Sequence, residues 1–122
     1  MEEKIKVLRV KPTYEPEVIE ISNDYRAIQN EVDGCFDVVY PFRDNICIFC
    51  NDMGKLNGME YNRPLHYEEG GFDFIFGTFL VAGERCGDNV SLTEEQISKY
   101  KDIFSIENMI RQTLRHLANG DL

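Results

Sequence analysis

The chain has 122 residues, of which 43% are hydrophobic and 29% charged, and a formal net charge of −9. A chain of this length forms one domain, 1–122, whose core is large enough to need no metal or disulfide. The negative charge disfavours direct binding to nucleic acid or to an anionic membrane. No apolar run reaches the roughly 20 residues that span a bilayer, and the charged start does not resemble a signal peptide, so we expect a cytoplasmic protein.

The acidic residues are spread along the whole chain. The local net charge is −3 over residues 1–35, −4 over 36–83 and −2 over 84–122. Because no acidic tail or block of like charge stands out, the charge serves solubility first. It also constrains a protein partner, which we expect to present a basic surface.

The first third of the chain predicts two strands and one helix. Charged and apolar residues alternate over 4–11, with a change of phase that suggests a bulge or a late twist. A β-branched run over 17–21 predicts a second short strand. Ser22 and Asn23 offer capping oxygens for a short amphipathic helix, which should end at 33–34.

The middle of the chain predicts further strands. Aromatic and β-branched runs over 36–42 and 45–51 indicate a hairpin. The strongest apolar run, 72–83, is bounded by glycines and predicts one central strand. Gly77 inside this run indicates a bulge or a close backbone approach.

Two helices are predicted at the end of the chain. Thr93 and Gln96 form a capping box, so a helix should begin just after Thr93. Ser105 can end that helix and cap another over about 106–118, whose apolar residues recur at helical spacing. We place His116 on the polar side of this last helix, where a cation near the C-terminus is favourable. The apolar faces predict packing against the sheet, or contact with a second copy of the chain.

The order of the elements is strands, helix, strands and two helices, without the strict alternation of a Rossmann fold. This order predicts a single α+β domain. We expect an antiparallel or mixed sheet covered on one face, with a short first helix and two C-terminal helices packed on it. The core should span about 4–104, and a C-terminal helical extension about 105–119.

The cysteines of the chain are Cys35, Cys47, Cys50 and Cys86. Cys47 and Cys50 have a spacing that can bind zinc, but they lie in a predicted strand, where residues three apart point to opposite faces. A shared metal would need a bend in this strand and further ligands, none of which has a second paired spacing. We therefore expect buried thiols, with no metal and no other cofactor.

The most unusual segment is 51–65, which is rich in asparagine and glycine. Amide side chains both donate and accept, glycine lets a ligand approach the backbone, and arginine offers a planar fork for carboxylate or phosphate. Such residues can line a ligand pocket, or they can build turns in which side chains satisfy the loop backbone. The candidate ligand-binding residues are Asn51, Gly54, Asn57, Gly58, Asn62 and Arg63.

Motifs for catalysis are weak. The sequence shows no P-loop, no G-x-S-x-G and no H-E-x-x-H motif. His66 is followed by Glu68 and Glu69, which could orient an imidazole, but no nucleophile is placed beside it. We assign no catalytic residue and expect a protein that is not an enzyme.

The order of glycines, asparagines and apolar residues carries a family resemblance. The segments that carry it are Asn51-Asp52-x-Gly54-Lys55-Leu56-x-Gly58, Asn62-Arg63-x-Leu65, Asp73-x-Ile75-x-Gly77-Thr78-Phe79-Leu80-Val81 and Leu92-Thr93-Glu94-Glu95-Gln96. Over roughly residues 4–100 the chain resembles the domain-of-unknown-function family 3846, short proteins of Gram-positive bacteria, conjugative elements and phages. The resemblance implies an accessory role and no particular reaction, and the last helix falls outside it.

Two functional hypotheses follow. The first is a non-enzymatic accessory protein of a mobile element or phage that binds and modulates a host protein, such as a defence nuclease with a basic groove. The second is a protein that binds or sequesters a small nucleotide-like ligand through the Asn, Gly and Arg region. A homodimer through the last helix is compatible with both.

Overall fold

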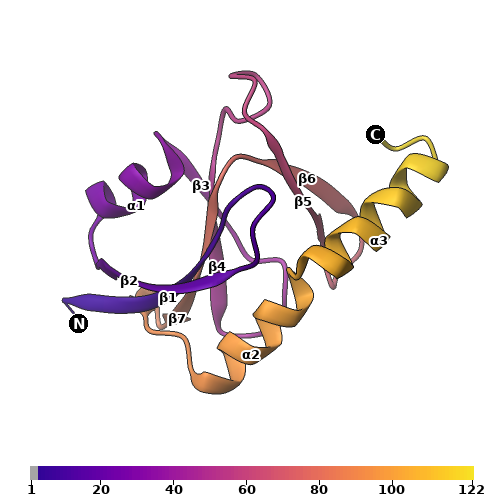
Figure 1. Ribbon diagram of the computed structural model, residues 1–122. Coiled ribbons are helices and arrows are strands. Elements are labelled where there is room, and N and C mark those ends of the chain that lie inside the picture. The colour runs from indigo at the N-terminus through magenta and orange to yellow at the C-terminus, as the bar shows by residue number, and fades with distance from the viewer. Residues whose placement is uncertain (1–2) are drawn as a thin grey trace.

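A six-stranded antiparallel sheet forms the centre of the computed structural model, which describes residues 3–122 (Figure 1). Five strands lie side by side in the order β2-β1-β7-β4-β3, and the short β8 pairs with the C-terminal half of β7. A separate antiparallel ribbon consists of β5 and β6. The predicted α+β class is confirmed. The strands are β1 Lys4–Val10, β2 Glu17–Ser22, β3 Phe36–Val39, β4 Ile46–Asn51, β5 Tyr61–His66, β6 Phe72–Phe76, β7 Phe79–Arg85 and β8 Asp88–Val90.

The large sheet is covered on both faces. Helix α1, Tyr25–Val32, packs on one face, where its Ile28 joins a core with Leu80. Helix α2, Glu94–Ile103, and the β5–β6 ribbon cover the other face, where Tyr100 joins a core with Val81. The expectation of a sheet covered on one face is therefore wrong, because successive residues of the central strands enter two different cores.

The predicted bulge in β1 is also wrong. The pairing of β1 with β2 runs without a shift from Lys4 opposite Ser22 to Arg9 opposite Glu17. Val7 lies in the core on the α1 side, and Leu8 lies in the core on the α2 side. Both faces of β1 are buried, so apolar residues stand at consecutive positions of a regular strand. These consecutive apolar residues explain the change of phase in the sequence.

The apolar run 72–83 forms two strands in two sheets, and the prediction of one central strand is wrong. The chain turns at Gly77, whose φ of +87° lies in the region that favours glycine. A Cβ at this position would lie 2.7 Å from the Sδ atom of Met59. The Gly77 amide donates to the carbonyl oxygen of Glu60 at 2.8 Å, so the predicted close backbone approach is confirmed. It marks the point where the chain leaves the ribbon for the large sheet.

Local signals define the helix ends. The cap of α1 is Asp24, whose carboxylate accepts from the Ala27 amide at 2.8 Å, and so the cap lies one residue after the predicted Ser22 and Asn23. The capping box at the start of α2 forms in both directions between Thr93 and Gln96, as predicted.

The last helix, α3, spans Ile106–Ala118 and begins at the predicted cap, Ser105. It extends away from α2 and lies along the β5–β6 ribbon, and β5 is the strand that it contacts most (Figure 1). His116 is buried, at 7% exposure, against this ribbon, and its predicted placement on the polar side of the helix is wrong. Of the helices described in residues 3–122, none has the length and apolarity needed to cross a membrane.

Candidate functional site

Asn51 of the predicted ligand-binding set holds backbone together at the end of β4. Its Nδ2 donates to the carbonyl oxygens of Val32 at 2.9 Å and Asp33 at 3.2 Å, which are the last carbonyls of α1. Its Oδ1 accepts from the Met53 amide at 2.8 Å. These three bonds join α1, β4 and the following turn, so the amide already has a structural role.

Asn62 lies in the interior, at 1% exposure, at the start of β5. Its Nδ2 donates to the carbonyl oxygens of Val10 and Gly77, both at 2.8 Å. Its Oδ1 accepts from the guanidinium of Arg63 at 2.6 Å. Asn62 therefore ties the ribbon to β1 and to the turn at Gly77, and its amide faces protein backbone.

Arg63 is equally buried, at 1% exposure, and its guanidinium binds backbone carbonyls from distant parts of the chain. It donates to Phe104 at 3.0 Å, to Tyr14 at 2.6 Å and to Lys11 at 3.4 Å. Burial lowers the pKa of the guanidinium, against a smaller opposing effect of Glu15. Arg63 joins the β1–β2 turn to the end of α2, and each of its three guanidinium nitrogens already donates to the protein.

The remaining candidates lie in the loop between β4 and β5. Gly54 is buried, and a Cβ there would lie 2.6 Å from the carbonyl oxygen of Phe76, so only glycine fits beneath β6. Asn57 and Gly58 are exposed, and Gly58 has a φ of +70° that suits its turn. The six predicted residues thus do not all converge on one concavity.

A pocket of about 260 Å³ opens beside this loop, between the edge of the large sheet and the ribbon. Its charged lining comes from Asp37 on β3, Asp52 after β4, Asp73 on β6 and Lys55 in the loop. Lys55 pairs with Asp73 at 2.9 Å. Among residues 3–122, no ion pair involves Asp37 or Asp52. The pocket also includes Asn51 and Gly54 of the predicted set, between apolar walls of Met53, Leu56, Phe74, Ile75 and Phe76.

The potential in this pocket is negative. Burial, reinforced by Asp37, Asp73 and Asp52, raises the pKa of the Cys50 thiol to about 11. An anion here would meet the same carboxylates, whereas a cation would be attracted to them. The pocket therefore suits a positively charged group better than a phosphate.

His66, for which the sequence offered Glu68 or Glu69 as a partner, contacts a second histidine. His66 Nε2 lies 2.8 Å from the Nε2 of His116 on α3, and Glu69 pairs with Arg43. His116 in turn contacts the Asp121 carboxylate through Nδ1 at 2.9 Å. Sequence reasoning missed this pair because the two histidines are fifty residues apart. The one available signal was the position of His116 at the margin of the apolar stripe of α3.

The expectation of buried thiols is confirmed for Cys47 and wrong for Cys35 and Cys86, which are exposed, while Cys50 is half-buried. The orientation of Cys47 and Cys50 follows their spacing. Cys47 belongs to the core on the α1 side, whereas Cys50 packs against the core on the α2 side, so the two thiols point to opposite faces of β4. Burial raises the pKa of Cys47 to about 12. Within residues 3–122, no group of three or more His, Cys, Asp or Glu side chains is arranged to hold a metal ion.

The architecture defines a small α+β domain whose sheet is buried on both faces and whose acidic pocket lies between that sheet and a two-stranded ribbon. Residues 5–105 match the family described as Domain of unknown function (DUF3846), and the chain belongs to this family. The match ends just before α3. No curated protein and no solved structure matches the chain.

Proposed function

We propose that this chain is a non-enzymatic binding protein that modulates a host protein with a basic surface, such as a defence nuclease. In this proposal the chain acts in the cytoplasm of a Gram-positive bacterium, as an accessory protein of a mobile element or phage. The observation that carries the proposal is the acidic pocket of Asp37, Asp52 and Asp73.

The pocket has the chemistry to receive a lysine or arginine side chain of a partner. Asp37 and Asp52 supply charge, and Phe74 and Leu56 supply apolar wall for the methylene stem of a basic residue. The net charge of −9 adds a long-range attraction that speeds and orients association with a basic partner. Because this attraction is screened by ions, we expect the complex to weaken as salt is raised.

An arginine-rich peptide is a direct probe of the pocket. Titration of the isotope-labelled protein should shift the amide resonances around Asp37 and Asp52, as followed by NMR. The double variant Asp37→Asn/Asp52→Asn should weaken peptide binding at least about tenfold, which corresponds to roughly 1.4 kcal/mol.

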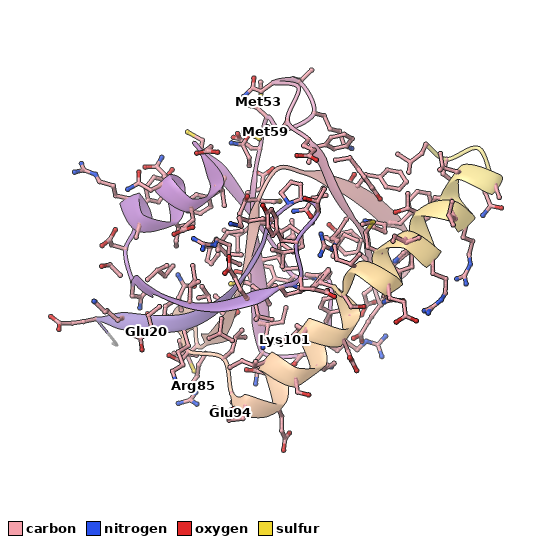
Figure 2. The ribbon with its side chains drawn as sticks, viewed as in Figure 1. Glu20, Met53, Met59, Arg85, Glu94 and Lys101 are labelled. Carbon is pink, nitrogen blue, oxygen red and sulfur yellow. The ribbon has the colours of Figure 1, made fainter. Side chains whose placement is uncertain are left out.

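A matched control separates the pocket from the overall charge. Met53 is one of the loop residues that line the pocket, and Glu20 and Glu94 lie at the end of the molecule away from it (Figure 2). The variant Glu20→Gln/Glu94→Gln removes the same two negative charges as the pocket variant. It should change the affinity less than about twofold, since distant exposed charges are screened. Equal weakening by the two variants would contradict a specific site.

The nucleotide-like ligand is the second candidate, and Asn51 and Gly54 in the pocket lining favour it. Arg63, the residue suited to phosphate, is buried and bound to backbone, and the pocket carboxylates repel an anion. A thermal shift with a panel of nucleotides tests this hypothesis. A ligand at 100 times its dissociation constant adds about 2.7 kcal/mol of stability, and no shift would count against nucleotide binding.

A second copy of the chain is the partner that we propose for the outer face of α3. Ile110, Leu114 and Leu117 on this face are 49%, 60% and 52% exposed. Residues 106–122 carry two acidic and two basic side chains, so this segment is neutral while the whole chain carries −9. Contact through α3 would bury apolar surface without bringing the acidic parts of two copies together.

A further inference from the structure

His66, at the end of β5, and His116, near the end of α3, meet tip to tip. The planes of the two rings differ by only 11°, and the ring centroids are 5.0 Å apart. The Nε2 atoms are 2.8 Å apart, and this distance plus the two ring radii accounts for the centroid separation. The rings therefore lie nearly in one plane and face each other through a hydrogen bond, and they do not stack face on face.

Proton counting shows which states of the pair can keep this bond. The Asp121 carboxylate can only accept, so the Nδ1 of His116, 2.9 Å from it, carries a hydrogen. When both rings are neutral, His116 Nε2 is bare and accepts from the Nε2 hydrogen of His66. With one added proton, one ring is an imidazolium and still donates to the other. With two, both Nε2 atoms carry hydrogens, and the bond is replaced by two facing positive charges.

We propose that His66 and His116 form a proton-operated latch, which holds the C-terminal half of α3 on the β5–β6 ribbon while at least one imidazole is neutral and releases it when both are charged. This inference is independent of the proposed partner binding. It concerns the joint between the family domain and the helix that follows it.

The surroundings of the latch are mostly apolar on the ribbon side. The ring centroids of Phe72 and Phe74 on β6 lie 4.5 and 5.1 Å from the ring centroid of His116. Asp121 beyond α3 and Arg115 on α3 are the charged groups next to the pair, and Glu68 lines a second pocket together with His66. Arg115 opposes a positive charge on His66.

The direction of the pH dependence follows from His66. Burial, together with the facing His116 and Arg115, lowers the pKa of His66. The released state therefore binds a proton more readily than the docked state near the ordinary histidine pKa of about 6.5. Docking of α3 is fully stabilised above that pH and weakens as the pH falls below it. Release also breaks the contact between the Tyr61 hydroxyl and Thr113 Oγ1, 2.9 Å apart in the docked state.

Hydrogen exchange of the whole chain at about pH 7.5 and about pH 5 tests the latch. After correction for the intrinsic effect of pH, the protection of amides in 113–118 should fall about tenfold at the lower pH. Release takes up one proton, so the equilibrium shifts by up to tenfold for each pH unit below about 6.5. Amides of β7, in the centre of the large sheet, should keep their protection and so report that the fold persists.

The variant His66→Gln is the control, because a neutral amide can donate or accept at the place of Nε2 in either protonation state of His116. It should remove the pH dependence of protection in α3. If this variant undocks α3 at both pH values, the NMR titration of the two imidazoles in the unaltered chain decides. Coupled titration in two steps is expected. Protection that does not change with pH, pH dependence that persists in docked His66→Gln, or independent single-site titration of the two rings would each overturn the latch.

Discussion

Helices α2 and α3 have similar sequence signals and very different environments. Both begin at a capping hydroxyl, Thr93 or Ser105, and both carry an apolar stripe. Helix α2 buries Tyr100 completely in the core beneath the large sheet. Helix α3 rests on the narrow β5–β6 ribbon, buries His116, and leaves Leu114 60% exposed.

An amphipathic pattern thus specifies which face of a helix is buried, but not the width of the sheet against which that face packs. A five-stranded layer can cover a whole helix face, whereas a two-stranded ribbon covers only one edge of it. The better-buried helix lies within the matched family range, and the half-exposed one follows it. Loss of contacts should therefore cost more stability around α2 than around α3.

The largest contrast is expected between two arginines. Arg63→Met removes the donor to the buried carbonyl of Phe104 and the donor to the partly buried carbonyl of Tyr14, so the free energy of unfolding should fall by more than about 3 kcal/mol. Arg111→Met removes an exposed pair with Glu107 on α3, and the loss should stay below about 0.5 kcal/mol. Urea denaturation measures both, and equal losses would contradict the contrast.

The next contrast compares two tyrosine hydroxyls. Tyr100→Phe removes a bond of 2.7 Å to the Asp44 carboxylate and should cost about 1.5–3 kcal/mol, while Tyr61→Phe removes the neutral bond to Thr113 and should cost about 0.5–1.5 kcal/mol.

The cost of Tyr100→Phe should depend on pH. Burial raises the pKa of Asp44, but the bonds from Tyr100 and Gln96 outweigh it and lower this pKa overall. A lowered carboxyl pKa contributes stability above the unfolded value of about 3.9, and this stability is lost as pH falls further. The difference between Tyr100→Phe and the unaltered chain should therefore shrink in acid. A difference that is constant from neutral to acid pH would contradict this role of Asp44.

A smaller loss of stability is expected when the cap of either helix is removed. Thr93→Ala and Ser105→Ala each remove a side-chain acceptor for an N-terminal amide and should cost about 1 kcal/mol. Only Ser105→Ala should also speed local hydrogen exchange of α3 amides, by roughly fivefold for 1 kcal/mol. Faster α3 exchange in Thr93→Ala would show that the two helices open together.

The smallest effect on stability is expected on the outer face of α3. Leu114→Gln exchanges a side chain that is already 60% exposed, so the free energy of unfolding should change by less than about 0.5 kcal/mol. If two copies meet through this face, the same variant should shift the chain toward the monomer in analytical ultracentrifugation. The control Leu56→Gln changes a leucine that is 81% exposed in the loop after β4, and should leave the mass unchanged.

Sequence patterns predicted most elements because the signals are local. The capping box at Thr93 and the end of the first helix at 33–34 each involve a few neighbouring residues, and both are present. The opposite orientation of Cys47 and Cys50 followed from strand geometry alone. The prediction of one strand over 72–83 was wrong because apolar residues indicate burial but do not show in which sheet a strand is buried.

The candidate site was less predictable. The sequence identified a segment with unusual polar chemistry, and Asn51 and Gly54 from it do lie at a pocket. Asn62 and Arg63 are equally polar in sequence, yet their partners are backbone carbonyls many residues away. Composition shows which groups can form hydrogen bonds, but only the folded chain shows whether protein or solvent occupies them.

The sequence by itself determined the α+β class, the sign of the charge and the ends of the helices, apart from the first cap, which is Asp24. Each of these depends on composition or on contacts within a turn or strand. The tertiary structure decided that the sheet is buried on both faces and that Asp37, Asp52 and Asp73 surround one pocket. It also decided that His66 meets His116. These features join residues far apart along the chain, and their positions depend on the packing of all the elements together.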